Sequence, residues 1–407
     1  MSGRSLVALL VIFFYPLYRI YLSLSYRLAV HRAGCSMPKS YRHRDPILGL
    51  DLFLRRVNSI KLGNSLDLDS DLFDTYGRTV QTNVWATKQY VTMDPLNIQT
   101  ICATQVEKFG SAPMNNAVCQ PLLGDGIITT DGAQWKRSRN LVNPIFARAQ
   151  VSELAPLENY VGRLLALIPL DGSTVDMQPL LKMLFLDSNT EFIFGRSSNA
   201  LAPEKSNLIA QRLPSVFDDA LRGMRKRFTL GKLRFLAGKD QPWLKKCREV
   251  HSIIVSFIDE EMELKNSQHR TSSDTSPYNY VLLRELVKST DDKLFIRNEL
   301  MNVFFPARDT SAILTGNILF LLARHPRVWD SLRAEVLTIG EQKLTFELLK
   351  LMKYMSAVIN ESKLVCLEAY SLLMWWEHSS SPPQPRGSEL EDLPRILRST
   401  SWGWVFW

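Results

Sequence analysis

The order of apolar and polar positions predicts a mainly helical chain that follows a short β-region. Thr79–Trp85 and Lys88–Met93 alternate between apolar and polar residues and are separated by a short turn, which is typical of a β-hairpin. Beyond the hairpin, apolar residues recur with a helical period over most of the chain. The predicted helices include Val151–Leu167, Leu180–Phe194, Trp243–Leu264, Asn279–Val287, Ile296–Ala323, Val328–Leu337 and Phe346–Ser362.

The N-terminus carries an apolar run over Leu6–Tyr18, and its extension to Tyr26 adds a single charge, Arg19. Such a run is barely long enough to span a bilayer. A cleavable signal peptide is the alternative, but no small-residue cleavage pattern follows closely. Most basic residues of this region follow the run, which places the rest of the chain in the cytosol. We therefore expect a single membrane anchor over residues 1–30.

Changes in composition suggest the division of the remaining chain. Residues 31–46 are basic and contain two prolines, which favours a linker. Residues 47–362 form the expected folded body, in which the polar stretch Lys265–Pro277 is an exposed loop between helices. Residues 363–407 hold five of the nine tryptophans and show no period, so we assign them no fold.

Composition and charge narrow the class of protein only slightly. A hydrophobic content of 45% and a charged content of 22% over 407 residues indicate a globular chain. The net charge of +8 is modest for this length, and a solvated surface explains it about as well as a binding patch. No nucleic-acid-binding signature accompanies the charge, so we expect no nucleic-acid partner.

The five cysteines stand far apart and form no CxxC pair, and no histidine cluster has the spacing of a zinc site. Each is expected to be a small buried apolar residue. The signatures GxSxG, HExxH and the phosphate loop are also absent, which removes the usual support for hydrolases and nucleotide-dependent enzymes. Gly124–Gly126 holds only the first glycines of a dinucleotide fingerprint and is too weak to use.

A first candidate site lies shortly after these glycines. Trp135 and Arg139 are four residues apart, so they share one face of a helix. The indole N–H and the guanidinium are both hydrogen-bond donors, and they suit a carboxylate such as a haem propionate. The alternative is a surface aromatic residue beside a solvated charge.

A second candidate site is the segment Phe305–Ser311 within a long apolar helix. Pro306 removes one N–H from the helix, so we expect a kink or a local opening at this turn. An acid and an alcohol at the turn, Asp309 and Thr310, could hold water and deliver protons. The alternative is an ordinary kinked helix with one ionic turn.

Four segments resemble, in order, successive landmarks of the cytochrome P450 family. In that family they would be the propionate-binding helix, the oxygen-activating central helix, the helix after it and the start of the ExxR helix. The resemblance covers about Asp45 to Ser362, and the ordered set is far more specific than any single member. The segments are Trp135 with Arg139, Ala307–Ser311, Leu322–Pro326 and Tyr354–Ser362. Shorter stretches resemble the fungal alkane and fatty-acid hydroxylases in particular, namely Asp45–Asp51, Asp187–Gly195 and Cys247–Asp259.

The resemblance implies a mainly α cytochrome P450 fold with a small N-terminal β-region. It implies a haem-dependent monooxygenase that hydroxylates n-alkanes or fatty acids, hydrophobic small molecules, with O₂ and with NADPH through a partner cytochrome P450 reductase. It assigns Trp135 and Arg139 to cofactor binding, and Asp309 and Thr310 to proton delivery in catalysis. It also implies attachment to the endoplasmic reticulum membrane, with the body facing the cytosol.

The chain departs from the family pattern at several positions. Pro306 and Ala307 stand where the family usually has alanine and glycine, the latter giving room at the helix. After Ser362 the resemblance ends, because Leu364 replaces the ExxR arginine and the segment around Cys366 lacks the glycines of a haem-ligand loop. We therefore expect the C-terminal haem-ligand segment to be missing and assign no metal ligand. The alternative function is a non-catalytic, membrane-anchored remnant or a gene-model artefact of such an enzyme.

Overall fold

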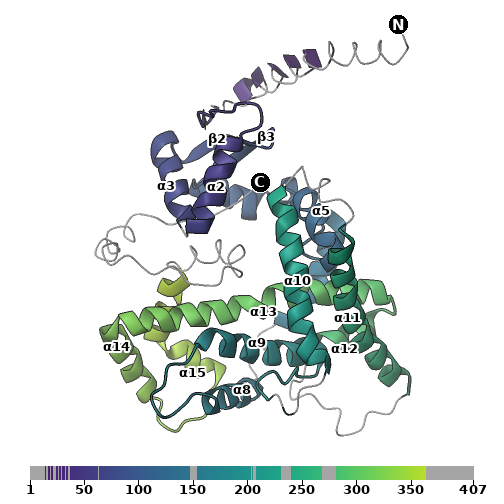
Figure 1. The fold of residues 1–407 in the computed structure, drawn as a ribbon, viewed down its shortest axis with the longest axis vertical. Helices are drawn as coiled ribbons and strands as arrows, with labels where there is room; N and C mark the ends of the chain where they lie inside the picture. The colour runs from purple at the N-terminus through teal and green to yellow at the C-terminus, as the bar shows by residue number, and fades with distance from the viewer. Residues whose placement is uncertain are drawn as a thin grey trace. The chain divides into compact units, whose positions relative to one another are not determined.

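The structure is a computed structural model of the chain. It describes residues 37–62, 64–146, 154–202, 204, 208–230, 240–267 and 281–363, together with scattered positions between 14 and 34. Over these residues the chain forms two compact units, one within Met1–Ser59 and Leu66–Ala103 and the other within Ile60–Ser65 and Thr104–Pro385. The predicted combination of many helices with a small β-region near the N-terminus is confirmed (Figure 1).

The prediction of an N-terminal membrane anchor is wrong. Among the residues that the structure describes, no helix has the length and apolar character needed to cross a membrane. Spanning the hydrocarbon core takes about 20 predominantly apolar residues. The unbroken run Leu6–Tyr18 is shorter than this, and Arg19 and Arg27 follow it. Residues 1–13, where most of the run lies, are outside the described residues.

The first unit contains a small sheet in the order β1-β2-β3. Strands β2 (Thr79–Val84) and β3 (Thr87–Thr92) pair antiparallel, with Val80 opposite Val91, so the predicted hairpin is confirmed. Its turn residues Trp85 and Ala86 both have positive φ angles, 52° and 56°. A two-residue hairpin turn of this kind needs positive φ at both positions, because the strands on either side twist.

Strand β1 (Lys39–Ser40) lies within the segment expected to be a linker and pairs in parallel with β2. The unit also holds several α-helices. They are α2 (Leu50–Leu62), α3 (Ser65–Tyr76) and α4 (Pro95–Gln99). A buried cluster of Phe73, Val80 and Val91 joins α3 to the sheet.

The stretch Asp45–Asp51 is held by hydrogen bonds within the first unit. The carboxylate of Asp45 accepts from the backbone N–H of Leu48 at 3.0 Å, which closes a turn. Asp51 accepts from Nδ1 of His43 at 2.8 Å. Gly49 has a φ of 69°, and a Cβ at this position would lie 1.9 Å from the carbonyl oxygen of Asn83. The conformation of this stretch therefore requires glycine at residue 49.

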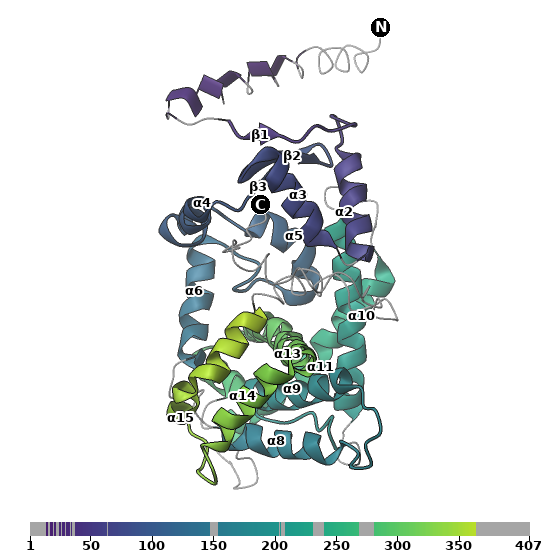
Figure 2. The same ribbon diagram turned by 90° about the vertical axis from the view of Figure 1, so that its left-hand side faces the viewer.

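The second unit is helical over its described residues. Its helices are α5 (Ala112–Leu123), α6 (Gly132–Val142), α8 (Ala155–Ala166), α9 (Met177–Phe194), α10 (Leu208–Leu230), α11 (Gln241–Ser267), α12 (Leu282–Ser289), α13 (Lys293–Arg324), α14 (Pro326–Leu337) and α15 (Phe346–Leu351). Helical backbone resumes from 353 to 363 after an interruption at Met352. Helix α13 packs most extensively against α9, and α10 packs against α11. Figure 2 shows α13 nearly end-on among these neighbours.

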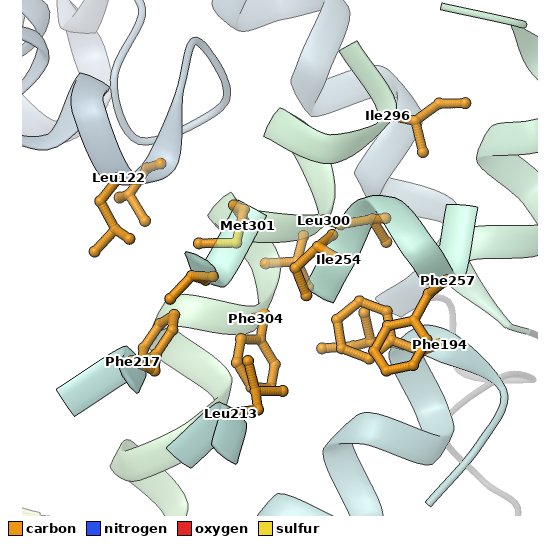
Figure 3. Close-up of a cluster of buried hydrophobic side chains, with 14 of the residues drawn as sticks. Leu122, Phe194, Leu213, Phe217, Ile254, Phe257, Ile296, Leu300, Met301 and Phe304 are labelled. Carbon is orange, nitrogen blue, oxygen red and sulfur yellow. The ribbon is translucent and has the colours of Figure 1, made fainter. Parts of the chain in front are cut away.

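The core of the second unit is built from aromatic and aliphatic side chains of several helices (Figure 3). Phe304 of α13 is fully buried, and its ring centroid lies 5.6 Å from that of Phe194 and 5.2 Å from that of Phe217. Phe257 of α11 lies 5.2 Å from Phe194. Because the rings come from α9, α10, α11 and α13, their burial holds these four helices together. A buried side chain of this size contributes roughly 1.5–3 kcal/mol.

Helix α13 continues through Pro306 without a break, so the local opening expected at that turn does not interrupt the helix. The residue before α13, Asp292, caps the helix by accepting from the N–H groups of Leu294 and Phe295. At the other end His325 is the C-cap of α13 and Pro326 is the first residue of α14. The expected loop Lys265–Pro277 lies mostly outside the described residues, as does the tail from residue 364.

Candidate functional site

Helix α6 carries the first pair of predicted site residues. Trp135 is half-buried and Arg139 is exposed in the last turn of the helix. The helix starts after Asp131, whose carboxylate accepts from the N–H groups of Ser111 and Ala112 at 3.0 and 2.9 Å and so connects the starts of α5 and α6. Trp135 and Arg139 therefore lie on one face of a helix whose start is fixed. This face offers hydrogen-bond donors to an anionic group.

Ser138 lies between these two residues and points in another direction. It is buried and its hydroxyl donates to Oε1 of Glu299 on α13. Glu299 has no exposed surface. Burial raises the pKa of Glu299 above its ordinary value, against the opposing effects of the Ser138 hydrogen bond and the positive charge of Arg137. This contact joins α6 to α13 through two buried polar groups.

The loop after α5 packs directly against asparagine side chains of α13. Asn302 donates through Nδ2 to the carbonyl oxygen of Leu123 at 3.0 Å and accepts at Oδ1 from the N–H of Ile128 at 2.9 Å. A Cβ on Gly124 would lie 2.0 Å from Oδ1 of Asn298, and one on Gly126 would lie 2.4 Å from Nδ2 of Asn302. Gly124 and Gly126 thus serve close packing, which leaves no reason to link them to dinucleotide binding.

The second pair of predicted site residues lies further along α13. Asp309 and Thr310 are half-buried, and the Thr310 hydroxyl donates to the carbonyl oxygen of Pro306 at 2.9 Å. Nδ2 of Asn189 on α9 donates to the next carbonyl, that of Ala307, at 2.7 Å. Two successive carbonyl oxygens at this turn therefore accept hydrogen bonds from side chains. The turn carries more polar interactions than an ordinary apolar helix.

The two pairs of site residues are not brought into contact with each other. Helix α6 meets α13 at Glu299, and Thr310 follows eleven residues later, which corresponds to about 16 Å along a helix. Any single ligand that reaches both pairs must therefore extend along α13.

The later landmarks of the predicted order also lie where helices meet. Leu322–Pro326 forms the junction of α13 and α14, as described above. Glu335 of α14 accepts from the N–H groups of Tyr354 and Met355, both at 2.8 Å, at the start of the helical stretch 353–363. A carboxylate at a helix start satisfies free N–H groups and complements the helix dipole. Both landmarks therefore lie at junctions between helices.

The described residues fit part of a haem site. The donors of Trp135 and Arg139 suit propionates, whereas no cysteine in the described ranges suits the iron. Cys119 and Cys247 are buried in the apolar core, and burial raises the pKa of both thiols to about 12. Cys102 is a free, exposed thiol. Cys366 lies outside the described residues, within which no cluster of three or more His, Cys, Asp or Glu side chains could hold a metal ion.

Comparison with known proteins identifies the family of the chain. The sequence profile of the cytochrome P450 family matches residues 46–362. The cytochrome P450 monooxygenase iccC of Talaromyces variabilis is 34% identical over 337 residues, which is 81% of this chain and 66% of that protein. The monooxygenase himC of Aspergillus japonicus is 33% identical over 85% of this chain and 62% of its own length. The monooxygenase apdE of Emericella nidulans is 32% identical over 81% of this chain and 63% of its own length.

The chain belongs to the cytochrome P450 family. It spans between 62% and 66% of the length of these three relatives.

Several polar residues of this region were not predicted. Asn298, Glu299 and Asn302 are buried on α13, and Asn189 and Ser138 contact it from α9 and α6. A signal for the first three was present, since polar residues three and four positions apart recur on one face of an otherwise apolar helix. Ser138 and Asn189 carried no such signal, because their partners are more than one hundred residues away.

Proposed function

We propose that the protein is a haem-dependent monooxygenase that hydroxylates a hydrophobic small molecule with O₂. NADPH would supply electrons through a partner cytochrome P450 reductase. Membership of the family carries this proposal. Two donors on one face of α6, and an acid and an alcohol on the long helix α13, support it.

The expectation of an alkane or fatty-acid substrate finds no support in the stretches on which it was based. In Asp45–Asp51, Asp45 closes a turn and Asp51 binds His43. In Asp187–Gly195, the buried carboxylate of Asp187 accepts from the N–H groups of Ala200 and Leu201. In Cys247–Asp259, Cys247 lies in the apolar core. These side chains serve folding, so we propose only the broader class of substrate.

Trp135 and Arg139 would hold the propionates of haem through hydrogen bonds and charge. Haem, when bound, supplies the iron at which O₂ is activated. None of the described residues is assigned as the ligand of that iron. The residues that we assign to cofactor binding would therefore contact only the propionate edge of haem.

Thr310 and Asp309 would manage protons on the central helix. A threonine hydroxyl that donates to its own helix can still accept a hydrogen bond at its oxygen. Oγ1 of Thr310 could thus receive a hydrogen bond from a water molecule or a substrate group beside α13. The half-buried carboxyl group of Asp309, one residue away, could exchange a proton with the same water.

The test is made on the purified protein with a cytochrome P450 reductase and NADPH. We expect haem binding, measured by the absorption spectrum of the bound haem, and substrate-dependent NADPH consumption. Thr310→Ala should lower product formed per NADPH by roughly tenfold or more and leave the substrate-induced spectral change intact. The control is Ser331→Ala, which removes a similar hydroxyl bond, 3.0 Å to the carbonyl oxygen of Arg327, on exposed α14.

Failure to bind haem, or turnover that the two variants affect equally, would contradict the proposal. A protein that folds but binds no haem would favour the non-catalytic alternative.

A further inference from the structure

We propose that Glu299 is a positioning residue that fixes the rotation of α6 about its axis and thereby orients Trp135 and Arg139 toward an acidic ligand. The identity of that ligand as the propionate edge of haem rests on the proposed function. The orientation of the helix does not, because it follows from contacts within this chain.

The first contact is the hydrogen bond between Ser138 and Glu299. Ser138 and Val142 are the buried residues of α6, and they are four positions apart, so they define its inward face. The hydroxyl of Ser138 donates to Oε1 of Glu299, which is fully buried on α13. The polar bond thus lies on the face of α6 that is packed inside the unit.

A second contact lies one residue earlier on α6 and one turn earlier on α13. The Cζ atom of Arg137 is 4.3 Å from the centroid of the Phe295 ring. Phe295 precedes Glu299 by four residues, so both face the same side of α13. Two adjacent residues of α6 therefore contact two residues that lie one turn apart on the same side of α13. Two such contacts restrict both the rotation of α6 and its position along α13.

The consequence for Trp135 and Arg139 follows from helix geometry. At about 100° per residue, Trp135 lies about 60° and Arg139 about 100° around the helix axis from Ser138, both in the same sense. The two residues are therefore neighbours at the border of the inward face. A rotation of α6 by a fraction of a turn would bury one of the donors or carry both into solvent.

The character of Glu299 argues for positioning rather than for stability alone. Its Oε2 atom is buried without a hydrogen-bond partner in the part of the chain that the structure describes. A buried polar atom without a partner costs free energy, and an apolar side chain of similar size would avoid that cost. A purely structural role would be filled at least as well by methionine. A role in holding Ser138 would not.

The experiment compares Glu299→Met, Glu299→Gln and Ser138→Ala with the unchanged protein, and uses Glu341→Met at an exposed position as a control. One measurement is the affinity for haemin relative to haemin dimethyl ester, which lacks free propionates. A second is amide hydrogen exchange over residues 132–142. A third is the thermal midpoint of unfolding.

We expect the unchanged protein to prefer haemin over the ester. Glu299→Met and Ser138→Ala should reduce that preference by about tenfold, because an oriented donor pair is lost. The same variants should exchange faster over α6, with a thermal midpoint that is equal or higher for Glu299→Met. Glu299→Gln keeps an oxygen acceptor for Ser138 and should retain both the preference and the protection.

The inference is overturned if Glu299→Met changes neither the ligand preference nor exchange over α6, or if it acts only by lowering the thermal midpoint. If the unchanged protein shows no preference for haemin while Glu299→Met still increases exchange over α6, the positioning role stands and the proposed haem function fails.

Discussion

The imidazole of His43 is held between Asp51 and the backbone of Asn83. Its Nδ1 lies 2.8 Å from Oδ1 of Asp51, and its Nε2 accepts from the N–H of Asn83 at 2.9 Å. Because Nε2 is an acceptor, the proton of the neutral ring is on Nδ1, which donates to Asp51. The acid thus selects the tautomer that binds strand β2.

Asp51→Asn should weaken this arrangement. Burial acts to raise the pKa of Asp51, but the hydrogen bonds from His43 and from the backbone N–H of Arg44 outweigh it and keep the pKa below its ordinary value. We expect a loss of roughly 1–3 kcal/mol, seen as faster amide exchange in β2. Asp71→Asn, at an exposed position of α3, is the control and should change little.

The stability that Asp51 contributes should decrease as the pH falls. A lowered pKa means that the stabilising contribution of Asp51 is present above the unfolded pKa of about 3.9 and is lost as the pH falls through the folded value. After correction for the intrinsic pH dependence of amide exchange, the protection of β2 should therefore fall in acid more for the unchanged protein than for Asp51→Asn. An equal loss of protection in both proteins would contradict this role.

Glu299→Gln should remove a loss of stability that occurs as the pH rises, whereas the contribution of Asp51 is lost as the pH falls. Because the pKa of Glu299 is raised by burial, its contribution to stability is fully present below the unfolded value of about 4.3 and is lost as the pH rises through the folded value. The glutamine variant cannot ionise and should escape this loss. Denaturant unfolding at a series of pH values should show the variant gaining stability relative to the unchanged protein as pH increases. Parallel profiles would refute the assignment.

Gly126→Ala should destabilise the second unit by about 1–3 kcal/mol, because the new methyl group would collide with the Asn302 amide that binds Leu123 and Ile128. Gly162→Ala is the matched control. A Cβ at Gly162 in α8 meets no atom within 4 Å, so alanine there should stabilise the helix by roughly 0.5–1 kcal/mol. Urea denaturation of both variants measures the difference. Similar effects from both would mean that the loop can yield to the added group.

Phe304→Ala should cost about 3–5 kcal/mol, since it removes a fully buried ring between Phe194 and Phe217. The control is Phe320→Ala on the same helix, where the ring is 56% exposed and contacts Arg324. The control should cost about 1 kcal/mol or less. The measurement is the thermal unfolding midpoint. A comparable loss for the two variants would mean that Phe304 is not a central residue of the core.

The sequence predicted those elements whose pattern is local. The hairpin strands were correct to within about one residue, although nothing in Trp85 and Ala86 signals the positive φ angles that they adopt. Helix α9 begins three residues before its predicted start, because Asp176 caps it. Helix α10 was not among the named helices, although Leu213, Phe217 and Met224 are buried at helical spacing. Pro214 lies inside this helix.

The candidate site was predictable only in part, because some of its contacts join residues that are far apart in the sequence. Trp135 and Arg139 are close in sequence, so helix geometry alone puts them on one face. The bond between Ser138 and Glu299 joins residues 161 positions apart, and no local pattern carries such information. The anchor prediction failed because a short apolar run was extended across Arg19 to reach a spanning length.

The close packing of Gly126 against Asn302 also constrains how this chain can change over generations. A side chain at residue 126 becomes acceptable only if residue 302 becomes smaller, and the loss of the Asn302 amide in turn leaves Leu123 and Ile128 without their bonds. Neither single replacement is neutral, so we expect substitutions at the two positions to occur together. Residues 126 and 302 should therefore co-vary during evolution, although 176 positions separate the glycine from the asparagine.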